Sequence, residues 1–178
     1  KIAHSDKSSK LPMWLKIIAF ALPQIGMTLL IAPVAVLGGI YAKYYGLSLT
    51  SIAAVILAAK VFDAITDPLI GYYSDRWRLK TGSRKPQILV GGLLLIPSAY
   101  FLFVPPSEVS ALYFAFCYMT FYLALTLFAI PYVAWAHEFT GTSKDKTLVF
   151  SAMNIAGQAG GALFYVLPLL PFFISTDI

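Results

Sequence analysis

The feature that most constrains this chain is a series of long apolar segments, each about as long as a lipid bilayer is thick. Five such segments occupy residues 15–42, 49–73, 87–104, 109–136 and 148–174. A helix needs about 20 largely apolar residues to cross the hydrocarbon core of a membrane. We therefore predict an all-α membrane protein with about five transmembrane helices.

Composition supports a membrane protein and excludes several other classes. The chain is 59% hydrophobic and only 12% charged, and its formal net charge is +5. The basic residues cluster between the apolar segments, which membrane topology explains better than nucleic acid binding. The one cysteine, Cys117, has no partner for a disulfide or a thiolate metal site. We find no nucleophile–base pair, metal-ligand spacing or phosphate loop, so we expect neither an enzyme nor a bound cofactor.

The basic residues also predict an orientation in the membrane. All of the 13 lysines and arginines except Lys43 and Lys60 lie in the N-terminal tail, at its membrane edge, or in the loops that we expect after the second and fourth apolar segments. Cytoplasmic segments carry an excess of such residues. We therefore expect residues 1–14 to be a cytoplasmic tail, residues 15–174 a transmembrane bundle, and residues 175–178 an extracytoplasmic end.

Three ionisable residues interrupt the second apolar segment. At 100° per residue, Lys60, Asp63 and Asp67 fall on one narrow face of a helix. Charged side chains at this depth are costly, so they should face protein or a water-filled cavity and neutralise one another. Lys60 can balance the charge of only one aspartate, so the three residues carry a formal charge of −1. A bound sodium ion or proton would neutralise this charge. Pro68 has no N–H, so the carbonyl oxygen of Ala64, four residues earlier, would be free to bind the same cation. The alternative is a buried salt-bridge network that only ties helices together.

The sequence around these residues resembles a known family of transporters. The stretch FDAITDPLIGYYSDRWRLKTGSRKP, supported by YYGLS and FAIPYVAW, resembles the glycoside-pentoside-hexuronide cation symporters of the major facilitator superfamily. The resemblance covers roughly residues 10–165. It implies a major facilitator-type helical bundle, of which this chain would be most of the N-terminal half, with the C-terminal half of the same transporter as its remaining partner.

The resemblance also implies roles for particular residues. It assigns the coupling-cation site, for sodium if the protein is sodium-coupled, to Asp63, Asp67, Thr66 and Thr126, with Lys60 for charge balance. It further assigns a cytoplasmic gate to Asp75, Arg76 and Arg84. For these three gate residues, a purely topological role of the charges is the alternative.

The resemblance is weaker where the solute would bind. Ala129 and Met153 stand where the melibiose-transporting member of the family has an aspartate and an arginine that bind the sugar. We therefore predict a neutral solute site that includes Asn154, Gln158 and Tyr122, because amides and tyrosines suit hydroxyl-rich solutes. The alternative for such polar groups is hydrogen bonding between helices.

Two glycines predict a packing contact rather than a site. Gly157 and Gly161 form a G-x-x-x-G pair in the fifth apolar segment, and such pairs let membrane helices approach closely.

The function that follows from the resemblance is secondary active transport. We expect a symporter that couples uptake of a small solute, such as a sugar or glycoside, to sodium or protons by alternating access. The alternatives are a lysolipid or other apolar-solute symporter, and a non-transporting membrane subunit that retains the fold. The expected location is the inner membrane of a bacterium.

Overall fold

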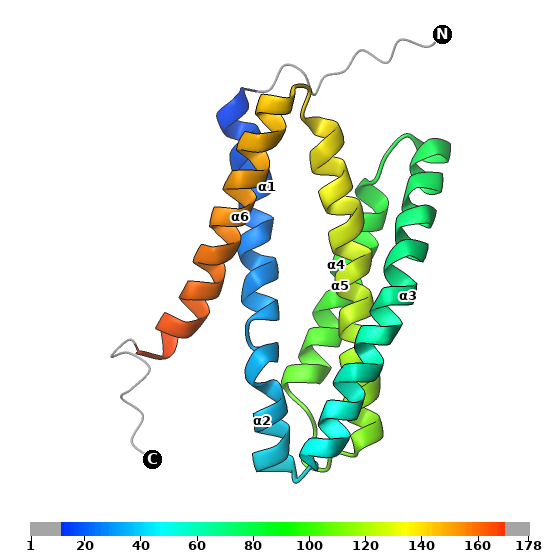
Figure 1. The fold of residues 1–178 in the computed structure, drawn as a ribbon, viewed down its shortest axis with the longest axis vertical. Coiled ribbons are helices and arrows are strands. Elements are labelled where there is room, and N and C mark those ends of the chain that lie inside the picture. Colours follow the sequence, from blue (N-terminus) through cyan, green and yellow to red (C-terminus); the bar gives the residue numbers. More distant parts are fainter. Residues whose placement is uncertain (1–11, 170–178) are drawn as a thin grey trace. The chain divides into compact units, whose positions relative to one another are not determined.

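The structure of the chain is a computed structural model that describes residues 12–169, whose regular elements are helical (Figure 1). They are α1 (Met13–Ile31), α2 (Val34–Tyr45), α3 (Leu49–Thr81), α4 (Lys85–Phe103), α5 (Ala111–Phe139), α6 (Ser143–Val166) and the short 3-10 helix η2 (Leu167–Leu169). The all-α prediction is confirmed. Most of the predicted N-terminal tail and the whole predicted extracytoplasmic end lie outside the described residues.

Each of the five predicted transmembrane segments contains helix. Within the described residues, four stretches are long and apolar enough to cross a membrane: Met13–Tyr45, Leu49–Thr81, Lys85–Phe103 and Ala111–Phe139. The fifth predicted segment corresponds to α6. It is not among the four because Asn154 and Gln158 lower its mean hydropathy, and because the apolar residues after position 169 are not described.

Pro33 divides the first predicted segment, which we expected to be one helix. The N–H of Ala32 still donates to the carbonyl oxygen of Thr28 at 2.8 Å, which closes α1. Pro33 has no N–H to continue the ladder, and α2 begins at the next residue. Four other prolines lie inside helices that continue past them: Pro23, Pro68, Pro97 and Pro131.

The second predicted segment is longer than expected. Ser48 caps the start of α3 by accepting a hydrogen bond from the N–H of Ser51, and Gly82 ends the helix in the left-handed conformation with φ 73°. We expected the residues after Tyr73 to form a loop, but no glycine or proline occurs between Tyr73 and Gly82. The 33 residues of α3 span about 50 Å, so its charged end extends well beyond a hydrocarbon core of about 30 Å.

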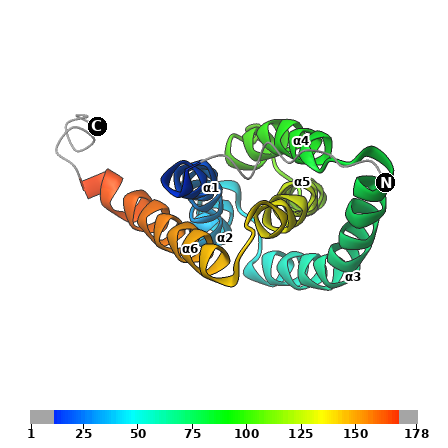
Figure 2. The ribbon, with the colours of Figure 1, turned by 90° about the horizontal axis from the view of Figure 1, so that it is seen from above.

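The chain forms two compact units, residues 1–35 with 136–178, and residues 36–135, and each is described by itself. In the first unit, α1 and α6 lie side by side (Figures 1 and 2). A Cβ atom on Gly160 would lie 2.8 Å from the carbonyl oxygen of Ile25, and one on Gly157 would lie 3.3 Å from the hydroxyl of Thr28. The predicted close packing at Gly157 and Gly161 is confirmed, with Gly160 at the tightest point.

The second unit is held together by contacts among α2, α4 and α5. The hydroxyl of the fully buried Tyr41 donates to the carbonyl oxygen of Leu102 at 2.7 Å, and its ring packs on Phe114. A Cβ atom on Gly91 would lie 2.5 Å from the backbone nitrogen of Phe128. This position therefore requires glycine for α4 and α5 to meet.

Large apolar side chains also cover the outer faces of the helices. On α3 they include Leu57, Val61, Ile65 and Leu69, all more than half exposed. An apolar surface of this extent suits lipid rather than water.

Candidate functional site

The charged face of α3 carries an ion pair near the middle of the helix. The Lys60 Nζ atom donates to Asp63 Oδ2 at 3.4 Å. The Lys60 side chain is 57% exposed, whereas that of Asp63 is only 14% exposed. The aspartate is therefore shielded by the protein, and the lysine reaches it from the open side.

The second oxygen of Asp63 has no such partner. Asp63 Oδ1 is buried and accepts no hydrogen bond from any described residue. A buried acceptor without a partner costs about 1–3 kcal/mol, and more when it is charged. This oxygen is therefore suited to a ligand that brings positive charge, such as a proton or a metal cation.

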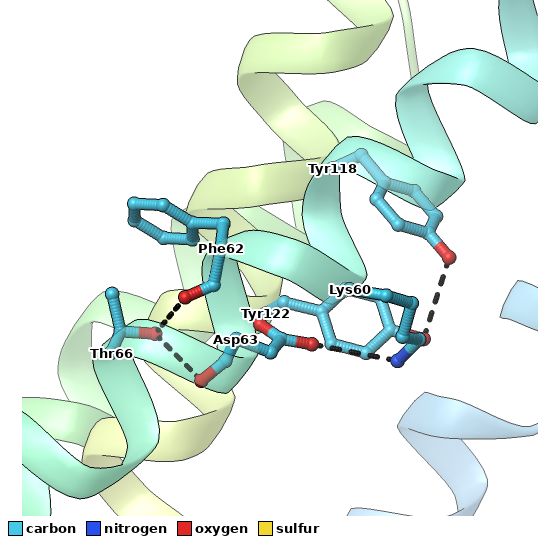
Figure 3. Close-up of polar contacts among 6 residues, drawn as sticks. All are labelled: Lys60, Phe62, Asp63, Thr66, Tyr118 and Tyr122. Carbon is cyan, nitrogen blue, oxygen red and sulfur yellow. Dashed lines mark hydrogen bonds and ion pairs between the residues drawn. The ribbon is translucent and has the colours of Figure 1, made fainter.

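Helix α5 brings two tyrosines to the charged face of α3 (Figure 3). The Nζ atom of Lys60 lies 4.3 Å from the centre of the Tyr122 ring, within cation–π range. The Tyr122 hydroxyl in turn lies 3.5 Å from that of Tyr118. We predicted Tyr122 as a solute ligand, and the structure places it against the lysine of the candidate cation site.

Two threonines were predicted as further ligands of the cation. Thr66 donates its hydroxyl proton to the carbonyl oxygen of Phe62 at 3.0 Å, as Figure 3 shows. The lone pairs of its oxygen therefore remain available to a cation. Thr126 lies one helical turn after Tyr122 and is half-buried.

Asp67 follows Asp63 by one helical turn, and its side chain is exposed. Asp63 is thus shielded by protein, whereas Lys60 and Asp67 are exposed in the described chain. That these two face a water-filled cavity stays a prediction. Within the residues that the structure describes, no three His, Cys, Asp or Glu side chains lie together as a metal site would require. The candidate cation site consequently depends on two carboxylates with hydroxyl and carbonyl oxygens.

A second polar cluster joins the end of α3 to the start of α4. Arg84 is 5% exposed and binds Asp75 Oδ1 through Nη2 at 2.5 Å. Its Nη1 donates to the Ser74 hydroxyl at 2.7 Å, and Ser74 donates to Gln87 Oε1 at 2.8 Å. Two of the three predicted gate residues, Asp75 and Arg84, are therefore in direct contact.

The third predicted gate residue is Arg76. It donates a hydrogen bond to Tyr72 on its own helix, not to a residue of this cluster. Sequence reasoning missed Ser74 and Gln87. The available signal was a serine directly before Asp75 and a glutamine directly after Pro86, both close to the charged motif.

The other predicted solute ligands lie on α6, in the first unit. The side chains of Asn154 and Gln158 are one helical turn apart and exposed, whereas Gly157 and Gly160 turn toward α1. Tyr122 belongs to the second unit. That these three residues contact one solute stays a prediction.

Comparisons with known proteins point to a family of transporters. The profile of the MFS/sugar transport protein family matches residues 19–177. No solved structure matches the chain.

Three relatives illustrate the range of similar proteins. The uncharacterized symporter YjmB of Bacillus subtilis is 32% identical over 79% of this chain and 33% of its own length. The putative glycoside/cation symporter YagG of Escherichia coli is 28% identical over 67% of this chain and 27% of its own length. The mouse sphingosine-1-phosphate transporter MFSD2B is 27% identical over 62% of this chain and 24% of its own length.

The chain thus spans about a quarter to a third of the length of these relatives. The family profile covers most of the chain, and the long apolar helices fit a protein that crosses the membrane several times. The family is one of transporters, not enzymes. The chain belongs to the MFS/sugar transport protein family of multi-pass integral membrane proteins.

Proposed function

We propose that this chain is the cation-coupling part of a symporter that drives uptake of a small solute with sodium or protons. The observation that carries the proposal is the shielded Asp63 carboxylate, which has one oxygen paired with Lys60 and the other without a partner. A carboxylate in this state gains stability from any bound cation.

The charge balance of the face explains why one cation suffices. Asp63 and Asp67 carry two negative charges and Lys60 one positive charge, so one sodium ion or one proton makes the face neutral. A neutral face is far less costly at membrane depth than a charged one. In the complete transporter, the exposed Asp67 and Lys60 would face a water-filled cavity through which the cation enters.

The solute that we propose is a sugar or glycoside held by neutral groups. Asn154, Gln158 and Tyr122 can bond hydroxyl groups and stack on a sugar face, and one relative is named a putative glycoside/cation symporter. A lysolipid is the second candidate. It is favoured by the name of the mouse relative and by the absence of charge at Ala129 and Met153.

The cluster around Arg84 suits the proposed gate. A charge-assisted contact at the α3–α4 turn would stabilise one orientation of the transporter over the other. We also propose that residues 1–14 and this turn lie in the cytoplasm, because positively charged segments remain on that side. One relative, YicJ of Escherichia coli, is named an inner membrane symporter, which supports the same location here.

Uptake by the full-length transporter in reconstituted vesicles tests the proposal. Asp63→Asn should abolish stimulation by an inward sodium or proton gradient while leaving insertion into the membrane intact. Asp145→Asn is the matched control, because Asp145 is an aspartate in the first turn of α6. Competition by glycosides against lysolipids then identifies the solute class. Full cation stimulation in Asp63→Asn would refute the proposed site.

A further inference from the structure

An apolar groove runs along α4 on the side that faces the second half of α5. It has a volume of about 580 Å³, within the range of small-molecule sites. Its lining includes Lys85, Leu89, Gly92 and Ile96 from α4, with Phe128 and Trp135 from α5. Figures 1 and 2 show the two helices side by side. The groove is separate from the candidate cation site.

Two adjacent glycines shape this groove. Gly91 lets the backbones of α4 and α5 touch, since a Cβ atom there would lie 2.5 Å from the nitrogen of Phe128. Gly92 lines the groove, and its missing side chain leaves space beside the Phe128 ring, which is 3.6 Å from the position of a Cβ atom. A large side chain at position 92 would fill this space.

The groove has one charged end and an otherwise apolar wall. Lys85 is the one charged residue in its lining, and its Nζ atom lies 5.6 Å from the centre of the Trp135 ring. A tryptophan with a basic residue at a helix end is typical of the level of the lipid headgroups. The neighbouring Arg84 is turned toward Asp75 and Ser74, so Lys85 provides the positive charge at this end.

The length of the groove matches one leaflet of a bilayer. From Lys85 to Ile96 the helix rises about 16 Å at 1.5 Å per residue, and half of the hydrocarbon core is about 15 Å. An occupant with an anionic head and one long apolar chain would therefore place its head at Lys85 and its chain along Leu89, Gly92 and Ile96.

We infer that this groove binds one acyl chain of an anionic phospholipid from the surrounding bilayer, with the headgroup phosphate paired to Lys85. The positive charge of Lys85 favours a lipid with an anionic headgroup over one with a zwitterionic headgroup. The apolar wall favours a lipid with an acyl chain over a small soluble anion. This site does not depend on the proposed transport activity, because it needs only the membrane-embedded fold.

Quenching of Trp135 fluorescence by brominated lipids tests the inference. The full chain, with Trp14→Phe and Trp77→Phe so that Trp135 alone fluoresces, is placed in phosphatidylcholine vesicles. Either brominated phosphatidylglycerol or brominated phosphatidylcholine is then added. We expect phosphatidylglycerol to bind about fivefold more tightly, since one lysine near an anionic surface contributes about 1 kcal/mol.

Three variants distinguish a specific lipid site in the groove from general attraction of anionic lipids to the basic surface of the protein. Lys85→Gln should reduce the preference for phosphatidylglycerol to about one, whereas Lys80→Gln, which removes an exposed lysine outside the groove, should preserve it. Gly92→Leu should weaken quenching by both lipids. Equal binding of the two lipids by the parent protein, or equal loss in Lys80→Gln and Lys85→Gln, would overturn the inference. If Gly92→Leu does not fold, the lysine pair still decides.

Discussion

Asp63 and Asp67 have the same side chain and lie on the same helical face, yet only Asp63 is shielded. Helical periodicity predicts which residues share a face, and it identified Lys60, Asp63 and Asp67 as one stripe. It does not predict which neighbouring helix covers them. The shielding of Asp63 and the contact of Lys60 with Tyr122 depend on the packing of α3 against α5, which no local pattern encodes.

The distance between Lys60 and Asp63 suggests a role for Tyr122. Their 3.4 Å contact is longer than the 2.7–2.9 Å typical of charge-assisted hydrogen bonds. The Tyr122 ring attracts the same ammonium group from 4.3 Å. We therefore expect the ring to restrain Lys60 and to keep it from closing fully on the carboxylate.

Replacing Tyr122 tests this role. In Tyr122→Leu the lysine can close on Asp63 and compete with the incoming cation. The half-saturating cation concentration for uptake should then rise about twofold to fivefold, as expected for a cation–π contact of about 0.5–1 kcal/mol. Tyr122→Phe keeps the ring and should retain the parent value. A similar change in both variants would instead assign the effect to the hydroxyl.

At the scale of the helices, glycine positions determine how closely α4 and α5 can pack. Gly91 and Gly92 are adjacent in sequence but differ in their surroundings. A Cβ atom at Gly91 would collide with the backbone of α5, whereas one at Gly92 would make an ordinary contact with the Phe128 ring.

Alanine substitutions at these two glycines should therefore differ in effect. Gly91→Ala should lower the free energy of unfolding by about 1–3 kcal/mol, because the helices must move apart. Gly92→Ala should change it little. Thermal unfolding of the purified chain in detergent measures both, and equal midpoints would show that the two helices do not meet at Gly91.

The turn between α3 and α4 carries the next prediction. Arg84→Ala removes the contacts to Ser74 and Asp75 and should favour opening of the side that we propose to be cytoplasmic. We expect labelling of a cysteine introduced at Ile70, in a Cys117→Ala background, to rise about threefold to tenfold from that side. Lys80→Ala is the control, since Lys80 is an exposed basic residue in the last turn of α3 that is not among the predicted gate residues. Unchanged labelling in Arg84→Ala would leave these charges only a topological role.

Sequence reasoning predicted the helices better than their ends. Apolar length located all five segments, but Pro33 divided the first, and the second continued past Tyr73 to Gly82. A charged, polar stretch suggested a loop after Tyr73, yet arginine, leucine and lysine are good helix formers. In this stretch the polar side chains predicted a loop, whereas the intrinsic helix propensities predicted a helix. The structure follows the helix propensities.

At the scale of the whole molecule, the predicted solute ligands are divided between the two units, with Asn154 and Gln158 in the first and Tyr122 in the second. Sequence spacing places Asn154 and Gln158 one turn apart on α6, and both are exposed. It cannot predict which residues of other helices complete the site, because those contacts depend on how the helices of a complete transporter are arranged.

A solute site made of neutral groups should discriminate only modestly among related solutes. A hydrogen bond between neutral groups contributes about 0.5–1.5 kcal/mol, so Asn154→Ala should weaken uptake of the solute by about twofold to tenfold. Melibiose should not be a substrate, because Ala129 and Met153 provide no charge to bind it. Sodium-driven melibiose uptake by the full-length protein would contradict this prediction, as would a complete loss of uptake in Asn154→Ala with insertion intact.

The most direct test of the central claim is the cation dependence of solute affinity in the purified full-length transporter. If Asp63 binds the coupling cation, the parent protein should bind its solute more tightly when sodium or protons are added. A factor of about 5–150 is usual for coupled sites. Asp63→Asn should bind with one affinity at all sodium concentrations and pH values. A cation dependence in Asp63→Asn equal to that of the parent would contradict the account.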